Sequence, residues 1–75
     1  MQFDKELNAR GMSCPLPIVK TKKVLTEMES EQVLKVISTD CGALKDMPAF
    51  TEQTGNLLLS VEEVGSEYVF YVKKK

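Results

Sequence analysis

The sequence predicts an α/β fold, a two-layer sandwich in which a mixed four-stranded sheet carries two helices on one face. The chain has only 75 residues, which leaves room for a single domain, residues 1–75. Its strand-like and helix-like segments follow one another in the order βαβαββ, and a short turn joins the last two strands. Right-handed crossovers between the strands place both helices on the same face of the sheet.

The N-terminal third contains a short strand followed by a helix. Residues 3–8 alternate between apolar and polar side chains, which is typical of a half-buried strand. Pro15 and Pro17 stand where the helix begins, since proline has no N–H to lose in the first turn and its fixed φ already suits a helix. A helix over residues 15–28 is predicted by side chains spaced three and four apart along one stripe: Ile18, Thr21, Leu25 and Met28.

The middle third repeats this order of strand and helix. Residues 32–39 centre on a largely β-branched run, which predicts a second strand. Asp40 follows as a candidate N-cap, and helical spacing continues until Gly55, a residue that commonly ends helices. Pro48 falls inside this helix and should kink or tighten its first turns. The side chains expected to be buried are Ala43, Leu44, Met47 and Phe50.

The last third predicts an antiparallel hairpin, because two strand-like runs, residues 57–62 and 67–72, flank Gly65-Ser66. The final strand points one row of side chains to each face of the sheet. With both helices on one face, we expect one row to remain uncovered and to meet solvent or a partner. The two rows are Tyr68, Phe70 and Val72, and Val69 and Tyr71.

Charge and composition exclude several classes of function. Ten basic and eleven acidic side chains give a net charge of −1, so the basic surface of a nucleic-acid-binding protein is absent and we expect no nucleic-acid partner. No apolar run is long enough to span a membrane, and the first residues lack an apolar signal core. We therefore expect a cytoplasmic protein without membrane insertion.

The sequence contains no histidine and two cysteines. The absence of histidine excludes Ser-His-Asp and Cys-His catalysis and histidine-liganded metals. Two cysteines are too few for an all-cysteine zinc or iron–sulfur site within one chain. We expect no metal and no cofactor, and two free thiols in a reducing compartment.

Cys14 lies in the most informative segment, Gly11-Met12-Ser13-Cys14-Pro15-Leu16-Pro17. It directly precedes the predicted helix, where free backbone N–H groups and the positive end of the helix dipole favour a thiolate. We therefore expect the pKa of Cys14 to lie below its ordinary value. The alternative is a small buried hydrophobic residue, the commonest role of a free cysteine. Its place in a loop rich in glycine, serine and proline favours a reactive, exposed thiol.

Residues 7–17 resemble the hallmark segment of the TusA/SirA/YedF/YeeD family of small sulfur-carrier proteins, whose motif is Gly-x-x-Cys-Pro-x-Pro. Residues 39–50 and 54–56 resemble the second helix of that family, so the similarity spans nearly the whole chain. The resemblance implies a βαβαββ sandwich and a persulfide on Cys14, with the motif completed by Gly11, Pro15 and Pro17. It also implies two protein partners, a sulfur donor such as a cysteine desulfurase or a rhodanese, and a sulfur acceptor.

Cys41 and Asp40 follow the second strand, at the sheet edge where Cys14 follows the first, so we expect the two cysteines to be neighbours. Many members of the family have proline at position 41, whereas the YeeD-type branch has cysteine. Cys41 is either a packed thiol in the first turn of the second helix or an accessory thiol. Asp40 is either an N-cap or a residue beside the active cysteine. Lys45-Asp46 and residues 73–75 are expected to be solvated surface.

Three functions are compatible with these residues. The first is a sulfur carrier with its persulfide on Cys14, acting in tRNA thiolation, cofactor assembly or sulfur oxidation. The second is a YeeD-like thiosulfate-processing or thiol-redox enzyme that uses Cys14 with Cys41. The third is a regulatory or binding module without chemistry at its cysteines. We favour the carrier, because sulfur relay needs one accessible thiolate and a partner that can approach it.

Overall fold

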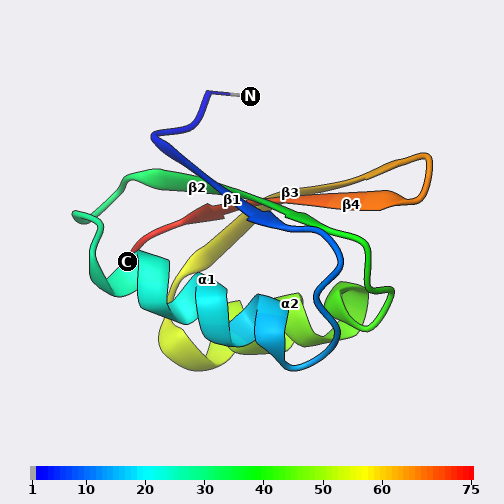
Figure 1. Cartoon of the computed structure of the whole chain (residues 1–75). Helices are drawn as coiled ribbons and strands as arrows, with labels where there is room; N and C mark the ends of the chain where they lie inside the picture. The colour runs from blue at the N-terminus through cyan, green and yellow to red at the C-terminus, as the bar shows by residue number, and fades with distance from the viewer. Residues whose placement is uncertain (1) are drawn as a thin grey trace.

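The computed structural model describes residues 2–75 and has the predicted order of elements, which confirms the two-layer α/β sandwich. Both helices lie against one face of the four-stranded sheet (Figure 1). Met1, the first residue of the expected domain, lies outside the described residues. The elements are β1 (Lys5–Ala9), α1 (Leu16–Thr26), β2 (Val33–Ser38), α2 (Ala43–Thr54), β3 (Leu57–Val64) and β4 (Glu67–Lys73).

The sheet has the strand order β1-β2-β4-β3, and its pairing is mixed as predicted. β1 runs parallel to β2, and the other two pairs of strands are antiparallel. In the parallel pair Ala9, the last residue of β1, lies opposite Ser38, the last residue of β2. The loops that follow these two strands therefore leave the sheet at the same edge, and these loops contain both cysteines.

The main core fills the space between the helices and the sheet. Phe70 and Leu34 are fully buried there at 0% exposure. Along α2 the buried residues follow the spacing of one helical stripe, namely Ala43, Met47, Phe50 and Thr51. Leu44 was expected in this core but is 40% exposed, because it lies at the edge of that stripe while Thr51 lies within it.

On the face of the sheet without helices, one row of β4 side chains was expected to stay uncovered, and this expectation is wrong. Val69 and Tyr71 are only 7% and 6% exposed. The segment before β1 lies on this side (Figure 1), where the Phe3 ring packs 6.4 Å from the Tyr71 ring and Lys35 Nζ lies 5.1 Å from the Phe3 ring centre. Backbone contacts of Asp4 hold this segment in place, since its N–H donates to the Val33 carbonyl at 2.7 Å. A second, smaller core therefore replaces the expected bare patch.

The buried position of Phe70 predicts a large effect of truncation. Phe70→Ala should lower the free energy of unfolding by about 3–5 kcal/mol, because it removes a ring from the centre of the main core and leaves a cavity. Urea denaturation followed by circular dichroism measures this change. Val64→Ala is the control, since Val64 is 59% exposed, and should change stability by less than about 0.5 kcal/mol. Similar losses in both variants would contradict the assignment of the core.

Candidate functional site

Cys14 lies exposed in the loop between β1 and α1. The chain turns sharply after β1, where the Met12 N–H donates to the Ala9 carbonyl at 3.2 Å. Gly11 has a φ of +77° in this turn, a backbone conformation that residues with a Cβ rarely adopt. Pro15 occupies the N-cap position of α1, so Cys14 stands immediately before the helix, as the sequence predicts.

The loop after β2 holds the Cys14 loop through two hydrogen bonds. Thr39 Oγ1 accepts from the Gly11 N–H at 2.9 Å, and Asp40 Oδ2 accepts from the Cys14 N–H at 2.7 Å. The other oxygen of Asp40 accepts from the Gly42 N–H at 3.2 Å. The N-cap residue of α2 itself is Gly42, without a side-chain cap. Asp40 caps the turn that leads into α2, because its side chain accepts from Gly42 and its carbonyl accepts from the Ala43 N–H at 3.0 Å. The same carboxylate also lies beside Cys14, since its other oxygen binds the Cys14 N–H.

Asp46 is the third polar residue of the site, and sequence reasoning missed it. The Cys14 thiol donates a hydrogen bond to Asp46 Oδ2, with 2.9 Å between Sγ and the oxygen. Asp46 lies in the first turn of α2. The start of this helix is tightened by hydrogen bonds between residues three apart, as is common at helix N-termini. The expectation of solvated surface is wrong for this half-buried carboxylate. The sequence did offer one signal for Asp46: it lies near the start of a predicted helix that begins at the same sheet edge as the helix after Cys14.

The two carboxylates reverse the expected direction of the Cys14 pKa. The hydrogen bond to Asp46 raises the pKa of the Cys14 thiol, and partial desolvation and the negative charges of Asp46 and Asp40 raise it further. The expectation of a lowered pKa was therefore wrong. It considered only the helix N-terminus next in sequence and did not include the carboxylate that α2 brings to the sulfur. At rest, the protonated thiol is favoured.

Cys41 lies in the neighbouring loop. It directly follows Asp40, whose carboxylate accepts from the Cys14 N–H, so the loops that contain the two cysteines are in contact. That the two sulfur atoms are themselves neighbours stays a prediction. Both residues are free thiols, and both are exposed. The interpretation of Cys41 as a packed thiol is therefore wrong, while a role as an accessory thiol stays a prediction.

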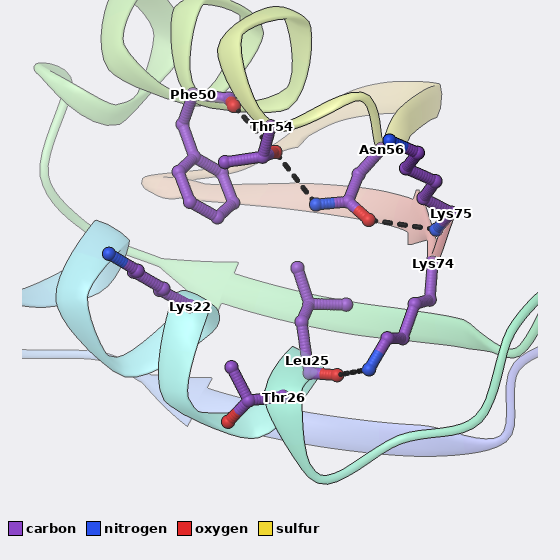
Figure 2. Close-up of a pocket in the computed structure, with 8 residues that line it drawn as sticks. All are labelled: Lys22, Leu25, Thr26, Phe50, Thr54, Asn56, Lys74 and Lys75. Atoms are coloured by element: carbon purple, nitrogen blue, oxygen red, sulfur yellow. Dashed lines mark hydrogen bonds between the residues drawn. The ribbon is translucent and has the colours of Figure 1, made fainter.

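A cavity of about 270 Å³ lies between the C-terminal ends of the two helices (Figure 2). Both cysteines lie in the loops before the N-terminal ends of these helices. Leu25 and Phe50 give the cavity an apolar lining between α1 and α2. At its rim Lys74 Nζ donates to the carbonyls of Leu25 and Met28, the latter at 2.7 Å. This lysine therefore satisfies backbone acceptors at the C-terminal end of α1, a position that favours positive charge.

Within residues 2–75, no group of three or more His, Cys, Asp or Glu side chains is placed to hold a metal ion. Neither helix in this part of the chain is long and apolar enough to cross a membrane.

Comparison with known proteins identifies the family. The family model described as sulfurtransferase TusA matches residues 5–74. The chain belongs to the TusA family. It is 53% identical over 72 residues to the sulfur carrier protein TusA of Allochromatium vinosum, covering 96% of this chain and 95% of that protein. It is 43% identical over 74 residues to the putative sulfur carrier protein YrkI of Bacillus subtilis, covering 99% of each.

The crystal structure of a SirA-like protein from Desulfitobacterium hafniense shares the fold, with a TM-score of 0.82 at 21% identity. The match covers 93% of this chain and 96% of that one. These findings confirm the resemblance drawn from the Cys-Pro-x-Pro segment, and they support a sulfur-carrier role for this TusA-family protein.

The contact between Asp46 and the thiol predicts how Asp46→Asn will change Cys14. Loss of the charged acceptor should lower the pKa of Cys14 and increase the thiolate fraction at neutral pH. Alkylation by iodoacetamide, followed against pH in a Cys41→Ser background, should become several-fold faster at neutral pH. Glu52→Gln removes the same charge from an exposed position of α2 and should leave the rate unchanged. An unchanged or slower rate in Asp46→Asn would contradict the assigned cause.

Proposed function

We propose that Cys14 is the residue on which this TusA-family protein carries sulfur, as a persulfide. The observation that supports it is an exposed free thiol in the Cys-Pro-x-Pro segment, held in place by Thr39 and Asp40 from the neighbouring loop. Gly11 forms the turn, and Pro15 and Pro17 fix the start of α1 behind the sulfur. The thiol is accessible to a reactive sulfur on another protein.

The reaction is the attack of the Cys14 sulfur on a sulfane sulfur, which leaves a persulfide on Cys14 and a reduced thiol on the donor. A second attack, by the thiolate of an acceptor protein, removes the sulfur again. Because the sulfur arrives on another protein, the site needs an exposed surface and no enclosed substrate pocket. The partners are a donor protein, such as a cysteine desulfurase or a rhodanese, and an acceptor protein, and we place the reaction in the cytoplasm.

A two-cysteine enzyme is the second candidate, because both thiols are free and exposed on loops that touch each other. In that reaction Cys41 attacks the inner sulfur of the Cys14 persulfide, which forms a disulfide and releases hydrosulfide. An external thiol must then reduce the disulfide before another cycle. The carrier needs no such reductant, and we favour it.

Loading with sulfur tests the role of Cys14 directly. After incubation with a persulfide-loaded cysteine desulfurase or with a rhodanese and thiosulfate, intact mass spectrometry should show a gain of one sulfur atom. Cys14→Ser should abolish this gain, because the attacking thiolate is missing. Treatment with a reducing thiol should remove the added mass from the wild type. Equal loading of wild type and Cys14→Ser would contradict the assignment.

Removal of Cys41 separates the carrier from the two-cysteine enzyme. Cys41→Ser should load to the same extent as wild type and should still deliver sulfur to an acceptor thiol, since one carrier sulfur is sufficient. Sulfide release from the persulfidated protein, measured without added thiol, should be equally slow in both forms. Rapid release by wild type that disappears in Cys41→Ser, with a disulfide in the product, would support the enzyme instead.

A further inference from the structure

We propose that Asp46 is the proton carrier of sulfur transfer at Cys14. Its carboxylate accepts the thiol proton when Sγ attacks the donor, and it gives that proton to the departing donor thiolate. This inference rests on the proposed function of Cys14 and adds a catalytic residue to it.

The geometry distinguishes Asp46 from the other carboxylate at the site. Cys14 Sγ lies 2.9 Å from Asp46 Oδ2, in a geometry that lets the thiol donate a hydrogen bond to this oxygen. Asp40 uses one oxygen for the Cys14 N–H and the other for the Gly42 N–H. These bonds to the backbone give Asp40 a positioning role. Of the two, it is Asp46 that is hydrogen-bonded to the sulfur whose proton must leave during the reaction.

The protonated state of the thiol gives a proton acceptor a role in the reaction. The surrounding carboxylates favour the protonated form of Cys14, whereas attack on a sulfane sulfur requires the thiolate. The chain contains no histidine, so the usual base for such a step is missing. The carboxylate already bonded to the thiol hydrogen is the group placed to remove it as the new bond forms.

The step balances without an oxidant or a reductant. For a donor persulfide R–S–S–H, Sγ forms a bond to the terminal sulfur while the bond between the two donor sulfurs breaks. The electron pair of that bond stays on R–S, which receives the Sγ proton through Asp46 and leaves as R–SH. Cys14 becomes Cys14–S–S–H. On delivery the direction is reversed: the acceptor's proton passes through Asp46 to Sγ, which is then the leaving group.

Two reagents with different leaving groups test this role. Glutathione persulfide releases an alkyl thiolate, which benefits from a proton, whereas dithiobis(nitrobenzoate) releases an aromatic thiolate that is stable without one. Asp46→Asn, in a Cys41→Ser background, should react several-fold faster with dithiobis(nitrobenzoate) because more thiolate is present. Its single-turnover sulfur uptake from glutathione persulfide should fall by about 10²-fold, the usual lower contribution of general acid–base catalysis.

Two matched variants complete the experiment. Asp46→Glu keeps a carboxylate and should recover part of the persulfide rate, and Glu52→Gln should match the parent protein with both reagents. An Asp46→Asn protein that is as fast or faster with both reagents would overturn the proposal, because Asp46 would then only suppress the thiolate. An Asp46→Asn protein that reacts more slowly with both reagents would also overturn the proposal, because the loss would then reflect damage to the site and not a missing proton carrier. A parent protein that takes up no sulfur would instead contradict Cys14 as the carrier.

Discussion

The parallel pairing of β1 with β2 is the constraint on which the site depends. Parallel strands end at the same edge of a sheet, and the register here sets Ala9 opposite Ser38. The two following loops must then leave side by side, and both helices must begin there. The backbone of Cys14 can reach Asp40 and its sulfur can reach Asp46 only because of this shared edge. An antiparallel pair would have put the two loops at opposite ends of the sheet.

At that edge, two opposing electrostatic influences act on the sulfur. The start of α1 favours a thiolate, while the hydrogen bond and the charge of Asp46 favour the thiol, and the thiol prevails. A protonated thiol reacts slowly with oxidants and electrophiles that an exposed cysteine meets. The hydrogen bond to Asp46 thus lowers the reactivity of the free sulfur toward such reagents.

The order of helices and strands could be predicted almost completely from the sequence. It depends on the local periodicity of apolar side chains and on a few residues that begin or end helices. Pro15 marks the start of α1, and Gly55, with a φ of +79°, marks the end of α2. The predictions that were wrong concern side-chain burial, which depends on how elements distant in sequence pack together. The exposure of Leu44 follows from the rotation of α2 on the sheet, and the cover over Tyr71 is supplied by Phe3, a residue far away in sequence.

The candidate site shows the same division. The cysteine that we propose as its nucleophile could be identified from one short segment. The carboxylate beside the sulfur could not, since the contact between Cys14 and Asp46 spans 32 residues of sequence. No pattern within either segment records that contact. It arises when two helices, each predictable alone, begin at one edge.

Lys74 contributes to how firmly the Cys14 end of α1 is held. By bonding the carbonyls of Leu25 and Met28 it ties the far end of α1 to the chain after β4, while Thr39 and Asp40 tie the loop at the near end. These contacts hold α1 at both ends and give the Cys14 loop a defined place at the sheet edge. Carriers that deliver a group on a long flexible arm cover distance by moving the arm. The proposed carrier residue, Cys14, instead has a short side chain on a loop that is hydrogen-bonded to its neighbour, so a partner protein must bring its own sulfur to the surface of this domain.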